Sequence, residues 1–161
     1  MFSVLAWNAG AQNLSLAKLG EMSKNGRVSF DFRYSAEGSP EISGSVIVQG
    51  NLYTMQVGED RVVCDGKRRY TIDNGAREVY IENADNISAL FTNPKLQNSV
   101  SSLKYGTDGK SLSGVIVNPD DKKKYSFSLS NIVCTQKSED KSAFAFSTSS
   151  LGDNWVITDL R

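Results

Sequence analysis

The sequence contains no histidine among its 161 residues, and this absence removes several classes of chemistry at once. A Ser-His or Cys-His nucleophile needs that side chain, and so does every metal site with an imidazole ligand. Only two cysteines are present, Cys64 and Cys134, which cannot form a zinc site by themselves. We therefore expect a binding protein and not an enzyme, with no catalytic residues, no metal and no cofactor.

An excess of charge of one sign is also missing, because 18 basic and 18 acidic residues give a formal net charge of zero. Nucleic-acid-binding domains usually carry a basic excess, so we expect no nucleic-acid partner. The chain also lacks an apolar run long enough to span a bilayer. A chain of this length is expected to form one domain with its own core, and the mature protein is expected to be soluble.

The N-terminal stretch is mostly apolar and has two interpretations. Residues 2–7 are followed by the small residues Ala9-Gly10-Ala11, a pattern typical of a signal-peptidase site before Gln12. The Lys or Arg that normally begins a signal peptide is missing from this stretch. Residues 1–11 are either the remnant of a signal peptide or an ordinary N-terminus. We favour the remnant, which leaves residues 12–161 as one domain.

Residues 52–81 contain four short apolar runs separated by turn residues. Asp65-Gly66 and Asn74-Gly75 supply the positive φ that tight hairpin turns require, so this stretch predicts an antiparallel meander. Within the runs every second residue is apolar, and a period of two places such residues on one face of a sheet. The side chains expected on that face are Tyr53, Met55, Val57, Tyr70, Ile72, Val79 and Ile81.

Alternation and turn residues predict further strands on both sides of the meander. These strands are expected at residues 27–34, 42–49, 111–117, 124–133, 143–148 and 155–159. A helix is expected at residues 13–25, capped by Asn13 and ended by Gly26 in the left-handed conformation. A short helix is expected around residues 87–91. For residues 96–104 a helix that starts at Asn93-Pro94 and a Ser-rich edge strand are both open.

Other features have structural explanations that compete with functional ones. Most aspartates fall in predicted turns, where Asp is favoured for backbone reasons, so we interpret them as turn residues and not as catalytic pairs. The clusters Lys67-Arg68-Arg69 and Lys122-Lys123-Lys124 are either solvated hairpin ends or docking patches for an acidic partner or anionic lipid. Cys64 and Cys134 are either buried free thiols, which we favour, or a disulfide formed in an oxidising compartment.

The order and spacing of the strands resemble a known family. A turn of sequence Asp65-Gly66-Lys67 lies between an apolar strand and a strand that carries Tyr70, and a second Gly-containing turn and an apolar strand follow. This arrangement resembles the LolA-type periplasmic carriers of outer-membrane lipoproteins. The matching segments are residues 28–32, 43–48, 62–67, 70, 73–75 and 79–81.

The resemblance implies a mainly β fold, an antiparallel, incomplete (half-open) β-barrel of about ten strands with a short helical lid over a hydrophobic cavity. Periodicity alone favours a solid sandwich core in place of a cavity, and the resemblance favours the cavity. The cavity residues that it implies are Phe30, Phe32, Val46, Val48, Tyr53, Met55, Val57, Tyr70 and Ile72. The lid residues that it implies are Leu16, Leu19, Met22, Ile87, Leu90 and Phe91.

The function implied by the resemblance is a monomeric periplasmic carrier that ferries acylated lipoproteins from the inner to the outer membrane. Its expected partners are those lipoproteins, an inner-membrane release complex and an outer-membrane acceptor. The alternatives are a lipocalin-like binder of a small lipophile, a lipid-sensing envelope domain, or a structural β-module without a ligand. One departure is clear, because the arginine with which the family latches its lid is replaced by Gln49-Gly50-Asn51. We therefore expect apolar packing to hold the lid.

Overall fold

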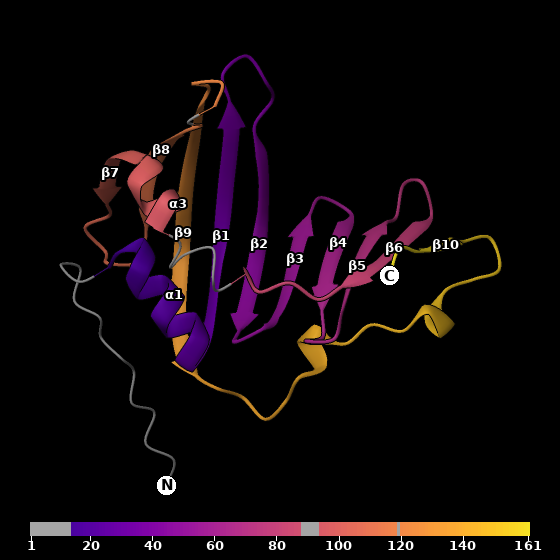
Figure 1. The fold of residues 1–161 in the computed structure, drawn as a ribbon. Helices are drawn as coiled ribbons and strands as arrows, with labels where there is room; N and C mark the ends of the chain where they lie inside the picture. The colour runs from indigo at the N-terminus through magenta and orange to yellow at the C-terminus, as the bar shows by residue number, and fades with distance from the viewer. Residues whose placement is uncertain (1–13, 88–93, 119) are drawn as a thin grey trace, which may run out of the picture.

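The computed structural model describes residues 14–87, 94–118 and 120–161, and it is built around one continuous ten-stranded sheet (Figure 1). The strand order is β10-β6-β5-β4-β3-β2-β1-β9-β8-β7, so the sheet is open and has β10 and β7 at its edges. The elements are α1 (Leu16–Asn25), β1 (Gly26–Ala36), β2 (Ile42–Gln49), β3 (Leu52–Val57), β4 (Asp60–Cys64), β5 (Arg68–Asp73), β6 (Glu78–Asn83), α3 (Pro94–Ser99), β7 (Val100–Tyr105), β8 (Leu112–Val117), β9 (Lys124–Gln136), η1 (Ser142–Phe144), η2 (Thr148–Ser150) and β10 (Val156–Asp159).

The predicted mainly β fold with about ten strands is confirmed, and neighbouring strands are antiparallel with one exception. β10 pairs with β6 in a parallel register, which the sequence prediction did not include. The strand expected at residues 143–148 is wrong, because this stretch forms parts of two 3-10 helices. Residues 96–104 contain both expected alternatives, the end of α3 and most of β7.

Helix α1 ends at Asn25 as predicted, but its N-cap and the conformation of Gly26 differ from the prediction. Its N-cap is Ser15, whose Oγ accepts a hydrogen bond of 3.0 Å from the backbone N–H of Lys18. Asn13, the predicted cap, lies outside the described residues. Gly26 has an extended φ of −146° and is the first residue of β1. A glycine is needed there because a Cβ would lie 2.5 Å from the carbonyl oxygen of Thr135. In the described part of the chain, no helix has both the length and the hydrophobicity to cross a bilayer.

Both faces of the sheet are covered, each by a different part of the chain. Helix α1 contacts β1, β2 and β9 on one face, which we call the helix face. Residues 137–155, which we call the strap, connect β9 to β10 and cover part of the other face, the strap face. The buried core of the helix face is Leu14, Leu16, Leu19, Met22, Val28, Phe30, Val46, Val48, Tyr53, Cys64, Leu112, Leu129 and Ile132. The buried core of the strap face is Val63, Tyr70, Ile72, Val79 and Ile81, on which Phe146, Leu151 and Trp155 pack.

The prediction that Tyr70 and Ile72 share a face with Tyr53 is therefore wrong, and the strand registers give the reason. Tyr53 pairs with Cys64, and Cys64 pairs with Arg69, so these three side chains lie on the helix face. Successive residues alternate between faces, so Tyr70 lies on the strap face. The apolar stripe of β5 and β6, which also includes Val79 and Ile81, packs against the strap and not against α1.

Polar side chains of the sheet fix the strap in place. The side chain of Gln49, only 5% exposed, accepts hydrogen bonds from Arg27 Nε and from the backbone N–H of Ser138, both at 2.9 Å. Its Nε2 donates to the carbonyl of Ser138 at 3.0 Å. Arg27 also lies over the ring of Phe144, with 5.1 Å between Cζ and the ring centroid. These contacts hold the start of the strap against the sheet and position Phe144 to be almost fully buried.

Candidate hydrophobic binding site

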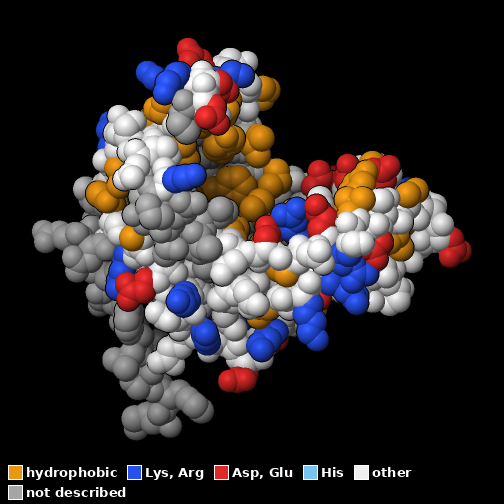
Figure 2. All heavy atoms as spheres, viewed as in Figure 1, with side chains coloured by type: hydrophobic (Ala, Val, Ile, Leu, Met, Phe, Trp, Pro, Cys, Tyr) orange, Lys and Arg blue, Asp and Glu red, His pale blue; other side chains and the backbone are white. Residues whose placement is uncertain are grey.

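An apolar recess lies on the helix face, beside the part of the sheet that α1 covers. Figure 2 shows hydrophobic side chains lining this hollow, with charged side chains on the part of the surface beyond it. Half-buried apolar residues pack against the core of this face and are the candidates for its lining. They are Phe32, Met55, Val62, Ala84, Ile87, Val100, Leu103, Phe127 and Cys134. Partial exposure separates these residues from the closed core beneath α1.

The predicted cavity residues are divided among three environments. Four of them belong to the closed core of the helix face and each is no more than 6% exposed: Phe30, Val46, Val48 and Tyr53. Phe32 and Met55 are half-buried and belong to the lining of the recess, and Val57 is half-buried at the end of β3. Tyr70 and Ile72 lie on the strap face. Seven of the nine predicted residues thus lie on the helix face, and only part of these are half-buried.

The predicted lid residues of α1 are buried, and they pack directly on the sheet. Leu19 is 1% exposed, and Leu16 and Met22 are also core residues. Ile87 packs against the same core from the segment that follows β6. Leu90 and Phe91 lie outside the described residues. Helix α1 thus packs on β1, β2 and β9 through these buried side chains.

A small pocket opens between the start of α1 and β7. It has a volume of about 220 Å³ and is lined by Ser15, Leu16, Ala17, Val100 and Leu103. Pockets that bury small ligands usually exceed roughly 300 Å³. This pocket alone is therefore too small for a drug-sized ligand, and we treat it as one border of the larger apolar surface.

Several lining residues were not among the predicted site residues. Val62 lies opposite Met55, so it faces the recess from the next strand. Phe127 comes from β9, which is next to β1 in the sheet. Val100 and Leu103 come from β7, whose conformation was left open. Strand alternation places each of these residues on the apolar face of its own strand, but only the order of the strands in the sheet brings them together.

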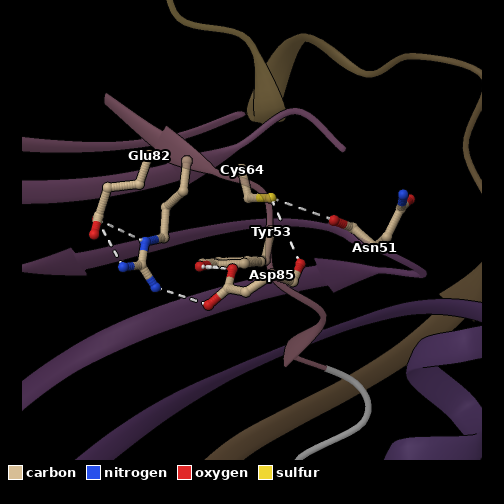
Figure 3. Close-up of polar contacts among 6 residues, drawn as sticks. Asn51, Tyr53, Cys64, Glu82 and Asp85 are labelled. Carbon is tan, nitrogen blue, oxygen red and sulfur yellow. Dashed lines mark hydrogen bonds and ion pairs between the residues drawn. The ribbon is translucent and has the colours of Figure 1, made fainter. Parts of the chain in front are cut away.

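A polar network borders the apolar surface where β3 and β4 meet β5 and β6 (Figure 3). The hydroxyl of Tyr53 donates to Asp85 Oδ1 at 2.6 Å, and Arg69 Nη1 donates to Asp85 Oδ2 at 2.8 Å. The same guanidinium forms two hydrogen bonds to Glu82 Oε2, at 2.7 and 3.1 Å. These bonds fix the backbone at the exit of β6, just before the segment that contains Ile87.

The raised pKa values of Tyr53 and of the adjacent Cys64 indicate that these groups have a structural role. Burial, with the Asp85 carboxylate as a second cause, raises the pKa of Tyr53 well above its ordinary value, so the hydroxyl remains a hydrogen-bond donor. Burial likewise raises the pKa of the Cys64 thiol, which faces the carbonyl oxygens of Asn51 and Asp85 at 3.5 and 3.9 Å. A raised pKa disfavours the reactive thiolate. Both cysteines are free, as expected, but only Cys64 is buried, and Cys134 is half-buried.

The position that carries the arginine latch in the resembling family has a different role here. The side chain of Gln49 forms its hydrogen bonds with the strap and with Arg27, on the strap face, and these bonds do not reach α1. The next residue does reach the helix, because the N–H of Gly50 donates to the carbonyl of Ser23 at 2.6 Å. The turn between β2 and β3 thus holds the end of α1 through its backbone.

The comparisons with known proteins bear on the fold. No family model matches the chain, and no curated protein matches it. A similar solved structure is an uncharacterized conserved protein from Thermus thermophilus, with 7% sequence identity. That match covers 89% of this chain and 96% of the other, with a TM-score of 0.51. At this identity the likeness shows a shared fold and nothing about activity, so the family resemblance remains a prediction from sequence.

Proposed function

We propose that this protein binds acyl chains on the apolar surface of its helix face and carries acylated lipoproteins through the periplasm. The observation that carries this proposal is the recess itself. Phe32, Met55, Val62 and Phe127 remain only half-buried at the edge of a well-packed core. Exposed contiguous apolar surface on a soluble domain is typical of a ligand or partner site.

Partial coverage suits a carrier, because a carrier must release what it binds. Each buried methylene contributes about 0.8 kcal/mol, so full burial of several long chains would amount to tens of kcal/mol and near-irreversible capture. A surface that shields the chains only in part lowers this gain. Displacement of α1, whose Leu19 and Met22 pack on the same core, would lower it further.

The lipoprotein cargo, the periplasmic location and the two membrane partners rest on the sequence resemblance. In this proposal an inner-membrane complex loads the monomeric carrier and an outer-membrane acceptor unloads it. The polar network of Tyr53, Asp85 and Arg69 would then mark the end of the apolar surface on the β5 side. In this proposal the open sheet acts as an incomplete barrel and α1 acts as its lid.

A second candidate is an interaction module without a small ligand. The observation that favours it is the closed core of Phe30, Val46, Val48 and Tyr53, four of the residues predicted to line a cavity. In this case the exposed apolar residues would bind a protein surface. A lipocalin-like carrier of a small lipophile differs from the main proposal only in its ligand.

The test uses a fluorescent fatty acid and a matched pair of variants. Met55→Arg places a charge in the lining of the recess, where the long side chain can still reach water, and should abolish probe uptake while the protein remains folded. Val133→Arg places the same charge on the opposite face of β9, at a valine that is 49% exposed, and should bind the probe normally.

Organic extraction and mass spectrometry of protein from its native host then identify any bound acyl species. A wild-type protein that takes up no probe and yields no lipid would contradict the carrier and favour the interaction module. If Met55→Arg unfolds, Met55 is part of the closed core, and the recess is smaller than proposed. Recovery of a small lipophile in place of acylated protein would favour the lipocalin-like alternative.

A further inference from the structure

The edge strand β10 and the residue after it concentrate exposed apolar side chains. Val156 is 57% exposed, Ile157 is 48% exposed, and Leu160 is 60% exposed. These are three of the seven large apolar side chains that are exposed in the described part of the chain. β10 is the last strand of the sheet, next to β6 (Figure 1). An exposed apolar edge strand is typical of a site where another strand pairs.

The hydrogen bonds between β10 and β6 determine which backbone groups of β10 face outward. The N–H groups of Val156 and Leu160 donate to two backbone carbonyls on the side of β6, at 2.9 and 2.8 Å. Backbone groups of successive strand residues point to opposite sides, so those of Ile157 and Asp159 point away from β6. No described strand lies beyond β10 to receive them. The outer side of β10 therefore offers these groups to a strand from elsewhere.

The other edge of the sheet is irregular, whereas the edge at β10 is regular. The pairing of β7 with β8 shifts its register between Ser101 and Lys104, and Ser102 has a positive φ of 54°. Irregularities of this kind turn an edge strand away from further pairing. β10 pairs with β6 in one register over its whole length. Of the two edges, β10 is thus the one suited to accept another strand.

The sequence of β10 is complementary to itself in an antiparallel arrangement. Ile157 pairs with Val79 of the strap-face core. The alternate residues Val156, Thr158 and Leu160 therefore lie on the helix face. In a two-fold pair centred on Thr158, Val156 of one copy lies opposite Leu160 of the other. Four exposed apolar side chains would then shield one another from water.

The same register satisfies the backbone and the charges. Ile157 lies opposite Asp159 of the second copy, so their outward N–H and C=O groups would bond to each other on both sides of the axis. Asp159 carries its own counter-charge, because Arg161 Nε donates to its Oδ1 at 2.8 Å. Arg161 comes opposite Trp155 of the second copy, where cation–π attraction is favourable. A pair centred on Asp159 would oppose two carboxylates, and one centred on Ile157 would leave Leu160 opposite a polar residue.

We propose that two copies of this chain pair along β10 in an antiparallel register centred on Thr158, which joins their sheets. The inference goes beyond the proposed function and does not depend on it, because the half-buried residues of the recess come from other strands, among them β1, β3, β4 and β9. The paired stretch is short, so the interface is smaller than that of a stable dimer and the association is weak. Dilute protein therefore remains the monomeric carrier, and pairs form at high concentration.

Disulfide crosslinking tests the register, in a background in which Cys134 is replaced by Ser. Antiparallel residues that face each other without mutual hydrogen bonds have Cα atoms about 4.5 Å apart, within the range that a disulfide needs. Thr158→Cys lies on the axis and should form a disulfide-linked dimer under mild oxidation. Val156→Cys is the matched control, because its two copies would lie about 13 Å apart along the strands. Non-reducing electrophoresis measures both rates.

Sedimentation equilibrium of edge variants tests the pairing without a crosslink. Ile157→Pro removes an outward N–H that β6 does not use, and edge strands tolerate proline at such positions. It should raise the dissociation constant of the pair by about tenfold or more and leave the circular dichroism spectrum unchanged. Leu160→Lys places a charge in the apolar contact, and tests the same edge if the proline variant does not fold. Val133→Lys, at a valine of β9 that is 49% exposed, should pair like wild type.

Three results would overturn the pairing along β10. One is wild-type protein that stays monomeric up to about 1 mM. Another is crosslinking of Val156→Cys at the rate of Thr158→Cys, and the third is a dimer that neither Ile157→Pro nor Leu160→Lys weakens. The proposed function is tested separately, because Leu160→Lys should take up the fluorescent fatty acid as wild type does. Failure of wild-type protein to take up that probe would contradict the carrier and leave the pairing unaffected.

Discussion

The ring and the hydroxyl of Tyr53 have separate roles. Its ring is part of the helix-face core and the residue is 3% exposed, while its hydroxyl reaches Asp85 at the border of the polar network. Hydrogen bonds to charged groups contribute about 1.5–3 kcal/mol, more than neutral ones. The hydroxyl therefore stabilises the fold by fixing Asp85, and the ring stabilises it by packing.

Replacement of Tyr53 by Phe should lower the free energy of unfolding by about 1.5–3 kcal/mol at neutral pH, because only the bond to Asp85 is lost. Tyr80→Phe is the matched control, since the Tyr80 hydroxyl also donates to a carboxylate, Glu78, but at the surface. Its loss of stability should be smaller. Denaturant titration of both variants measures the difference, and equal losses would contradict a special role for the buried bond.

The pH dependence of the same pair has a definite sign. The pKa of Tyr53 is raised in the folded state from its ordinary value of 10.0, so this contribution to stability is complete below that pH. Above it, unfolded chains lose the tyrosine proton while folded chains keep it, and stability falls. Tyr53→Phe should therefore lose less stability than wild type between pH 10.0 and higher pH. The thiols of buried Cys64 and half-buried Cys134 titrate in both proteins, so their main contribution is common to the two pH profiles.

At the scale of elements, α1 and the strap cover opposite faces of the sheet by different means. Helix α1 is held by buried Leu19 and Met22 and by the backbone bond from Gly50 to Ser23. The strap is held at its start by the side chain of Gln49, at the end of β2. The adjacent residues Gln49 and Gly50 thus hold the strap on one face of the sheet and α1 on the other.

This division predicts that Gln49→Ala and Leu19→Ala loosen different elements. Gln49→Ala leaves the N–H of Ser138 and the guanidinium of Arg27 without their buried partner, so amide exchange should rise in residues 138–146. Leu19→Ala removes a buried side chain at a cost of about 2–5 kcal/mol and should raise exchange in residues 14–25. Hydrogen-exchange mass spectrometry resolves both segments. A sharp rise in residues 14–25 with Gln49→Ala would show that Gln49 latches the helix after all.

Local pattern predicted the strands well because alternation and Gly-containing turns are recorded in the sequence around each strand. That pattern could not show which face of the sheet the apolar side chains of β5 occupy. Tyr70 and Ile72 form as clear an apolar stripe as Tyr53 and Met55, and only the register through Cys64 and Arg69 assigns the stripes to opposite faces. The strap was missed for a related reason. Its apolar residues mimic a strand, but their partners are the side chains of β5 and β6.

At the scale of the whole molecule, the two cores meet in one strand. β4 contributes Cys64 to the helix-face core and Val63 to the strap-face core, and both residues are fully buried. This explains the run of apolar residues at 62–64, since a strand buried on both faces does not alternate. The candidate site also depends on the arrangement of the whole sheet. Four separate strands, β1, β3, β4 and β9, contribute its half-buried side chains, which are Phe32, Met55, Val62 and Phe127 respectively.

A shared strand predicts that the two cores unfold together. The fluorescence of Trp155 reports on the strap face once Trp7, which lies outside the described residues, is replaced by Phe. Thiol labelling of Cys64 reports on the helix face once Cys134 is replaced by Ser. Both reporters should give one denaturant midpoint. Val63→Ala should shift both midpoints by the same amount, equivalent to about 1–3 kcal/mol, although Val63 touches only the strap-face core. Because the ladder from β3 through β4 to β5 is unbroken, loss of packing on one side weakens the strand that the other side also needs. A Trp155 transition that moves alone would show that the strap and its core open as a separate unit, with β4 still held by the helix face.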